Sequence, residues 1–272
     1  PGDFDNDGDA DFYLGNDGKD YEPFPGEVNV VLENKFNEGY EFIPHQVQGP
    51  KYNHQASVGD IDNDGDLDIT TNQNGLEVGL NSSSQIQVIF ENKGGFVFEE
   101  KLNIVQGTDN LNLAASKIDL IDINNDGFLD LFHGSGIDPT GTCNGMDSEF
   151  LANNGYETCP DMQAKIFLGN GSLSYSFDNY LLVPDVENFH NPGGVIFCLD
   201  LNNDGNKELI TGRSGIVTGD RFATRGYYIQ ILSYSNGELI DITSELIEDN
   251  YEEGYDGQPD CRLDLKINGV DR

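Results

Sequence analysis

The sequence is poor in bases: 14 Lys and Arg stand against 49 Asp and Glu among 272 residues, for a formal net charge of −35. Such an acidic surface repels nucleic acids and anionic membranes, so neither is expected as a partner. The chain also lacks any apolar stretch near the ~20 residues that a membrane-spanning helix needs, so direct membrane insertion is not expected. Trp is absent, and there are only four Cys.

Low basicity with high charge can indicate disorder, but the rest of the composition argues against it. Hydrophobic residues make up 36% and aromatic residues 10% of the chain. They lie in short alternating runs, which are typical of β-strands, and no useful length of sequence has a helical period. The sequence therefore predicts an ordered, all-β protein.

An acidic segment of nine residues occurs four times, beginning at Asp3, Asp60, Asp122 and Asp200. The starts are 57, 62 and 78 residues apart, and the shared pattern is D-x-[DN]-x-[DN]-G-x-x-[DE]. Repetition at fixed offsets predicts a structural unit of about sixty residues.

Four short strand-like runs accompany each acidic segment. In the second repeat they lie near residues 57–59, 67–70, 87–93 and 96–99, with a tight turn between the last two; in the third repeat the last run lies at residues 173–177. Four-stranded units (A to D) at this period predict the blades of a β-propeller, with the acidic loop joining strands A and B. A β-sandwich array is the alternative, and it predicts weaker repetition.

The acidic loops have the composition of metal sites. Oxygen donors occupy positions 1, 3 and 5, Gly at position 6 allows a sharp bend, position 7 offers a carbonyl, and the acid at position 9 closes the cage. Hard oxygen ligands in this number suit Ca²⁺ rather than Zn²⁺, so about four Ca²⁺ sites are expected. The predicted ligands are Asp3, Asp5, Asp7, Asp9 and Asp11; Asp60, Asp62, Asp64, Asp66 and Asp68; Asp122, Asn124, Asp126, Phe128 and Asp130; and Asp200, Asn202, Asp204, Asn206 and Glu208.

Two other interpretations of the loops were weighed. An EF-hand needs an acid at position 12 and flanking helices, but Leu14, Thr71, His133 and Thr211 occupy that position. A polar turn without metal is plausible for a single copy. It is disfavoured for four copies in register, because unneutralised carboxylates at such short range repel one another.

The loops and the strands that follow them, as in DGDLDITTN and DGFLDLFHG, resemble the FG-GAP or VCBS repeat family, which includes the propeller of the integrin α-chain head. The resemblance covers nearly the whole chain. It implies Ca²⁺ in the A–B hairpin of each blade, a secreted or cell-surface location, and cell adhesion or recognition as the usual role. Asn124 and Asn202 at position 3 reduce the loop charge and are expected to weaken binding, while Glu208 replaces Asp at position 9.

The repeats predict one propeller domain, or a fragment of one, over residues 1–272. Their bounds are about 1–47, 48–106, 107–184 and 185–260, with a terminal strand at 261–272. The first repeat lacks a strand A, whereas residues 261–267 resemble one. Either a four-bladed ring closes by pairing the two ends, or the chain is an arc of a larger ring in a larger secreted or surface protein. Residues 264–269 align with a degenerate fifth loop in which Lys266 takes a ligand position, so no calcium is expected there.

The four cysteines predict disulfides, in agreement with secretion. Cys143 and Cys159 bracket part of the longest connection, and Cys198 and Cys261 could pair between neighbouring innermost strands; four reduced thiols are the alternative. Asn81 and Asn170 begin N-glycosylation sequences.

Ligand recognition is expected on the longer connections, which lie on the face opposite the calcium loops. Arg213, Arg221 and Arg225 share one connection and could bind a carboxylate or an acidic sugar; pairing with nearby acids is the alternative. The sequence predicts a non-catalytic adhesion or recognition module for a glycan or protein.

The alternative function is that of a calcium-dependent propeller lyase acting on acidic polysaccharides. His54, His190 or a Tyr would then work with the Arg cluster. No nucleophile elbow, phosphate loop or dinucleotide fingerprint occurs, so we expect no enzymatic activity.

Overall fold

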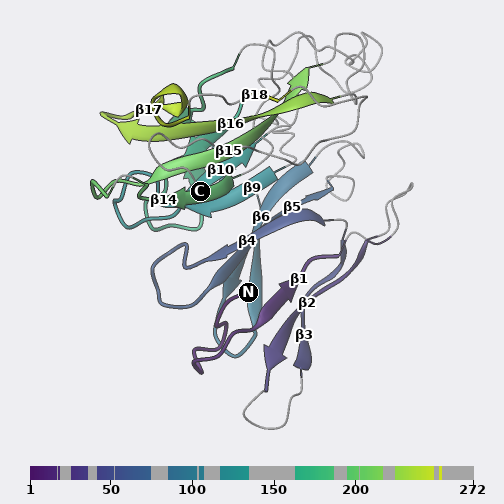
Figure 1. Ribbon diagram of the computed structural model, residues 1–272. Coiled ribbons are helices and arrows are strands. Elements are labelled where there is room, and N and C mark those ends of the chain that lie inside the picture. Colours follow the sequence, from purple (N-terminus) through teal and green to yellow (C-terminus); the bar gives the residue numbers. More distant parts are fainter. Residues whose placement is uncertain are drawn as a thin grey trace. The chain divides into compact units, whose positions relative to one another are not determined.

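The computed structural model describes residues 1–16, 18, 26–35, 42–51, 53–74, 85–102, 104–106, 117–134, 163–186, 195–201, 203–216, 224–247 and 251–252. The described residues are almost all in strands and turns, with one four-residue helix, α2 (Thr243–Leu246) (Figure 1). None of the helices among them is long and apolar enough to cross a membrane. The all-β fold predicted from the sequence is confirmed.

The chain divides into two compact units. The first contains Pro1–Asp122, Gly127–Leu131 and Phe167–Tyr180, and the second contains Ile123–Asp126, Phe132–Ile166 and Leu181–Arg272.

The second repeat forms a complete four-stranded antiparallel sheet. It contains β4 (Asn53–Gly59), β5 (Asp68–Asn74), β6 (Gln85–Asn92) and β7 (Phe98–Leu102), in that order. The second acidic loop joins β4 to β5, and a tight turn with Gly94, Gly95 and Phe96 at positive φ joins β6 to β7. These are the predicted strands A to D.

The first repeat forms a three-stranded sheet of β1 (Phe12–Leu14), β2 (Glu27–Asn34) and β3 (Phe42–Lys51). They correspond to strands B, C and D. Before them, Gly2 and Asp11 form an isolated antiparallel bridge. Gly59 and Asp68 pair at the same positions around the second loop, so the repeats share one register.

The strands of the other two repeats follow one another across the sheet in the same order. One sheet has the order β13-β11-β10-β9, and the other has the order β14-β15-β16-β17 with β18 also paired to β16. The strand bounds are β9 (Lys117–Ile121), β10 (Asp130–Gly134), β11 (Lys165–Phe167), β13 (Tyr180–Leu182), β14 (Val195–Leu199), β15 (Glu208–Ile216), β16 (Thr224–Ser235), β17 (Glu238–Asp241) and β18 (Tyr251–Glu252). The closed ring remains a prediction.

One predicted strand is wrong. The run at residues 173–177 was expected to be the outer strand of the third repeat, but β13 takes that place. Instead, β12 (Tyr175–Ser176) pairs in parallel with β8 (Val105–Gln106). The reason is the Tyr175 side chain, which is only 2% exposed in the core of the first unit and donates its hydroxyl to the Leu129 carbonyl at 3.1 Å.

Two apolar clusters fill the first unit, and each includes a residue from an acidic loop. Phe4 is wholly buried in a cluster with side chains of β2, β5 and β6. Ile61 is 1% exposed in a cluster with side chains of β6, β9 and β10. Burial of one such side chain contributes about 1.5–3 kcal/mol, so the core holds the loops in place.

Candidate metal centres

In the first, second and fourth loops, the first acid closes the turn by accepting backbone N–H groups. In the first loop, Asp3 Oδ1 accepts from Asp7 N at 3.1 Å, and Asp3 Oδ2 accepts from Gly8 N at 3.0 Å. Asp60 and Asp200 make the same pair of bonds in the second and fourth loops. An Asp side chain that captures nearby backbone groups in this way favours a tight turn.

Position 4 is Asn in all four loops, although the repeat pattern given above leaves this position open. Asn6, Asn63, Asn125 and Asn203 have φ angles of 60°, 59°, 57° and 60°. Asn tolerates this left-handed conformation better than most residues because its short polar side chain can bond locally. The recurrence of Asn at one offset was therefore a signal of backbone geometry that the sequence already contained.

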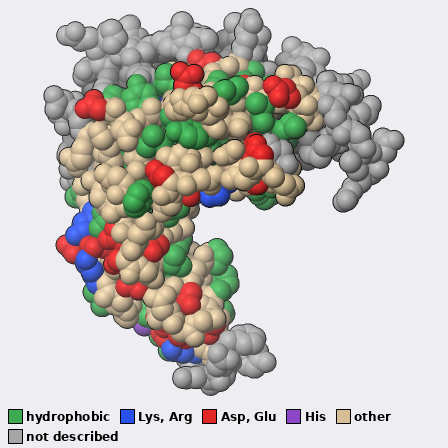
Figure 2. Space-filling view, turned by 90° about the vertical axis from the view of Figure 1, so that its left-hand side faces the viewer, with side chains coloured by type: hydrophobic (Ala, Val, Ile, Leu, Met, Phe, Trp, Pro, Cys, Tyr) green, Lys and Arg blue, Asp and Glu red, His purple; other side chains and the backbone are tan. Residues whose placement is uncertain are grey.

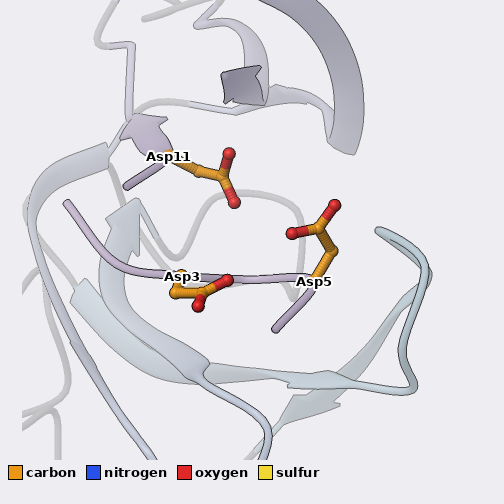
Figure 3. A group of neighbouring side chains, drawn as sticks. All are labelled: Asp3, Asp5 and Asp11. Carbon is orange, nitrogen blue, oxygen red and sulfur yellow. The ribbon is translucent and has the colours of Figure 1, made fainter. Parts of the chain in front are cut away.

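Three carboxylates meet in each of the first two loops. One carboxylate oxygen from each of Asp3, Asp5 and Asp11 lies within 4.8 Å of the others. Figure 3 shows these side chains directed toward a common space, with Asp3 and Asp5 on the loop and Asp11 directly before β1. Asp60, Asp62 and Asp68 form the equivalent group. Positions 1, 3 and 9 thus converge in both loops, while the side chains at positions 5 and 7, which were also predicted to be ligands, are not part of either group.

Some of these oxygens have no bonding partner. Asp5 Oδ1, Asp9 Oδ1 and Asp62 Oδ1 are buried and accept no hydrogen bond from any described residue. A buried carboxylate oxygen without a donor is costly, and a divalent cation would satisfy it. The donor set consists of carboxylates alone, which fits Ca²⁺.

The pKa values of these carboxyl groups report the same crowding. Burial first, and then the charges of Asp7 and Asp11, raise the pKa of Asp5. Burial and the charge of Asp64 raise the pKa of Asp62. Burial raises the pKa of Asp68 to about 7, even though backbone N–H groups donate to it. Positive charge at either group would reverse these shifts.

The acid at position 9 also joins its loop to a neighbouring strand. Asp68 Oδ2 accepts from Ile61 N at 3.1 Å, and Asp68 Oδ1 accepts from Asn92 N at the end of β6 at 2.9 Å. Asp11 makes equivalent bonds to Phe4 and Asn34. This acid therefore shapes the loop as well as contributing to the carboxylate group.

The third and fourth loops have Asn instead of Asp at position 3. Asn124 Nδ2 donates to Asp126 Oδ2 at 2.9 Å, and Asn124 Oδ1 accepts from Asp126 N at 3.0 Å. In the fourth loop, Glu208 Oε2 accepts from Leu201 N at 2.8 Å, as Asp68 does from Ile61, while Asn202 lies outside the described residues. Within the described part of the chain, a group of three acids forms only in the first two loops.

A chain of side-chain bonds joins successive loops. Asn63 Nδ2 donates to the carbonyl of Gly127 in the third loop at 3.1 Å. Asn6 donates in the same way to Gly65, and Asn125 to Gly205, at 3.4 and 3.1 Å. Position 4 therefore links each loop to the next.

Arg213, one member of the predicted arginine cluster, does not form an open binding site. This side chain is 1% exposed, and its Nε and Nη2 atoms donate to Gln230 Oε1 at 2.7 Å and to the Pro184 carbonyl at 2.6 Å. Burial lowers its pKa to about 10. Arg213 has a packing role, since a buried guanidinium already bonded within the protein is not available to a ligand.

Most of the remaining predicted site residues lie outside the described part of the chain. Those outside it are Arg221, His190, Cys143, Cys159, Cys261, Asn81 and residues 264–269. His54 lies on β4, Arg225 on β16 and Cys198 on β14. The exposed Asn170 accepts a bond from the Ser172 hydroxyl at 2.6 Å. The disulfides remain predictions.

The Asn63 conformation can be tested by two substitutions. Asn63→Ala removes the bond to Gly127 and places an ordinary residue at positive φ, so it should lower the free energy of unfolding by about 1–2 kcal/mol. Asn63→Gly removes the same bond but tolerates the backbone, and should cost less. Denaturant unfolding measures both values; equal losses would show that the left-handed backbone carries no strain.

The raised pKa of Asp68 predicts a pH dependence in calcium-free buffer. Its folded pKa of about 7 exceeds the ordinary value of 3.8, so the folded state binds this proton more tightly than the unfolded chain. The contribution of Asp68 to stability should therefore decline as the pH rises from 3.8 to about 7. Unfolding curves for the native chain and for Asp68→Asn across this range isolate the effect. Parallel pH profiles would contradict it.

Comparison with known proteins identifies one repeat. Residues 3–71 match the family described as FG-GAP-like repeat. A search of curated proteins finds no match. Among solved structures, the chain is similar to a fructofuranosidase from Schwanniomyces occidentalis in complex with fructosylnystose, at 9% identity and a TM-score of 0.36.

That match covers 79% of this chain and 40% of the fructofuranosidase, so the chain spans less than half of that enzyme. A likeness at this TM-score indicates neither fold nor activity. The family match covers both loops in which three carboxylates meet. Residues 3–71 therefore carry an FG-GAP-like repeat.

Proposed function

We propose that this protein is an extracellular, calcium-binding β-propeller module that recognises a glycan or a protein without catalysis. The observation that carries the calcium assignment is the buried oxygen of Asp5 and of Asp62, each unpartnered among the described residues and each belonging to a group of three carboxylates. Asp3, Asp5 and Asp11 would hold one ion, and Asp60, Asp62 and Asp68 a second.

The ion would act on the structure rather than on a substrate. A bound dication supplies positive charge where carboxylates crowd together. The residues of the chain hold the loop in shape: Asp60 closes the turn, Ile61 anchors it in the core, and Asp68 bonds it to β6. Since only the folded chain assembles this group, calcium would stabilise the protein by mass action.

A rigid scaffold of this kind suits recognition. Propeller connections on the side opposite the A–B loops would form the ligand surface, because function in such folds is concentrated on loops that a rigid frame presents. Acidic side chains are scattered over the face in Figure 2, a surface that favours neutral or basic partners over nucleic acid. The resemblance to adhesion propellers supports a secreted or surface location, as part of a larger protein.

The calcium assignment predicts a stability shift that depends on Asp62. Calcium should raise the melting temperature of the native chain relative to chelator, and Asp62→Asn should weaken binding at one site by about tenfold or more, because affinity follows ligand charge. The exposed Asp178, which lies outside the loops, provides a matched control as Asp178→Asn. Calorimetric titration measures the affinities. Identical melting with calcium and with chelator would rule out the assignment.

The recognition role predicts calcium-dependent binding without turnover. The protein should retain members of a glycan array or surface-protein panel in calcium and release them in chelator. Incubation with uronic polysaccharides should produce no absorbance of unsaturated products. Appearance of that absorbance would replace the recognition role with the lyase alternative, and an absence of retained ligands would remove the recognition role.

A further inference from the structure

A groove lies beside strands β1 and β4 in the first unit, and we call it the β1–β4 groove. Its volume is about 570 Å³, which is within the range of small-molecule sites in proteins. Neither group of three carboxylates lines it, so the proposed calcium sites do not use it. The polar side chains that line it belong to Tyr13, Asn53, Gln55, Ser57 and Thr71.

Two lining residues lie at strand ends away from the acidic loops. β1 begins directly after Asp11 of the first loop and ends at Leu14, so the lining residue Gly15 follows the far end of this strand. β4 begins at Asn53 and ends at Gly59, directly before the second loop. Gly15 and Asn53 are therefore on the side opposite the loops, where we propose that the ligand surface forms.

Asn53 has a donor and an acceptor that the described chain does not use. The residue is 3% exposed, yet neither its Oδ1 nor its Nδ2 atom has a partner among the described residues. Native proteins rarely leave a buried amide unsatisfied, because the amide loses its bonds to water without replacing them. A ligand in the groove that brings hydroxyl groups to both atoms would replace those bonds.

Tyr13 provides a third polar group of this kind. Its hydroxyl is buried and lacks a partner among the described residues. Burial raises the pKa of this hydroxyl, so it stays protonated and able to donate. Gly15 lies beside it, since a Cβ at residue 15 would be 3.2 Å from Tyr13 Cε1 and 3.6 Å from the hydroxyl oxygen. Gly at this position therefore leaves space beside the Tyr13 hydroxyl.

The other polar side chains that line the groove bond within the protein. Ser57 Oγ accepts from Leu120 N at 3.1 Å, and Thr71 Oγ1 donates to the Gln55 carbonyl at 2.8 Å. Gln55 Oε1 accepts from Ile118 N at 3.3 Å. The two side chains without partners are therefore exceptions in this groove, and they are the ones left for a ligand.

The lining favours a neutral ligand that is rich in hydroxyl groups. None of the lining residues has a charged side chain, so a charged ligand would lose hydration without gaining a counter-charge. A purely apolar ligand would leave the Asn53 amide and the Tyr13 hydroxyl unsatisfied. Hydroxyl groups both donate and accept hydrogen bonds, so adjacent sugar hydroxyls match the N–H and C=O of one carboxamide.

We infer that the β1–β4 groove binds a neutral saccharide, with the Asn53 amide and the Tyr13 hydroxyl as the groups that recognise its hydroxyls. The inference rests on the proposed recognition of a glycan, and it names the site and the class of sugar. Ala56 and Val58, which also line the groove, provide apolar contact for the C–H groups of the sugar ring.

The test uses the full chain and two substitutions that remove polar atoms with little change of shape, Asn53→Leu and Tyr13→Phe. The probes are glucose, galactose, mannose, fucose, N-acetylglucosamine and the charged sugar glucuronate, each titrated in calcium buffer. NMR follows the backbone amide of Gly15 and the side-chain amide of Asn53. At least one neutral sugar should shift both signals saturably and bind more tightly than glucuronate. Asn53→Leu should weaken its binding about tenfold, and Tyr13→Phe about fivefold.

Melting temperatures separate recognition from packing. Each substitution removes a buried polar group without a partner, so each variant should melt at or above the temperature of the native chain. Tyr180→Phe provides a matched control at an exposed tyrosine outside the groove, and it should leave sugar binding unchanged. A fall in melting temperature for both groove variants would show that these groups serve the fold, and would overturn the inference.

Three binding results would also overturn it. They are an absence of shifts at Gly15 and Asn53 with every neutral sugar, unchanged affinity in both groove variants, and glucuronate bound as tightly as the best neutral sugar. The glycan array tests the proposed function separately. A ligand retained on the array without shifts at Gly15 and Asn53 would assign recognition to another surface, and would overturn this inference alone.

Discussion

Repulsion among carboxylates confined to a nine-residue turn is the constraint on which the rest of this structure depends. In the first two loops the acids at positions 1, 3 and 9 are held close together, although each would be more stable apart in water. Backbone N–H groups neutralise part of this charge at Asp60 and Asp68, but the buried oxygen of Asp62 receives none. Positive charge at this place would offset the repulsion among these carboxylates.

The loops also connect the repeats to the core and to one another. Phe4 and Ile61 anchor them in the core, and the Asn at position 4 reaches the next loop. Asn92 provides a second link, because its N–H donates to Asp68 Oδ1 at 2.9 Å and its side chain donates to the Phe4 carbonyl at 2.8 Å. A change at one carboxylate group would therefore affect the core of its own repeat and the loop beside it.

Repeats of this kind bury surfaces against one another, and the first and second sheets differ in how far one apolar face is buried. Ile69 in β5 is wholly buried, whereas Phe12, which takes the same place in β1, is 41% exposed. Leu14 is 42% exposed on the same strand. Burial at this position therefore differs between two repeats that share one strand register.

The sequence by itself determined the four acidic loops and the strand order of the second repeat, because turns and strands depend on local patterns of charge, Gly and alternating apolar residues. Tertiary structure alone decided that Tyr175 enters the core and draws β12 to β8, and that Arg213 is buried against Gln230. The same holds for Asn53, whose buried side-chain amide has no partner among the described residues. Burial and bonding of these side chains depend on residues far away in the chain, and no local pattern records which of those residues will be neighbours.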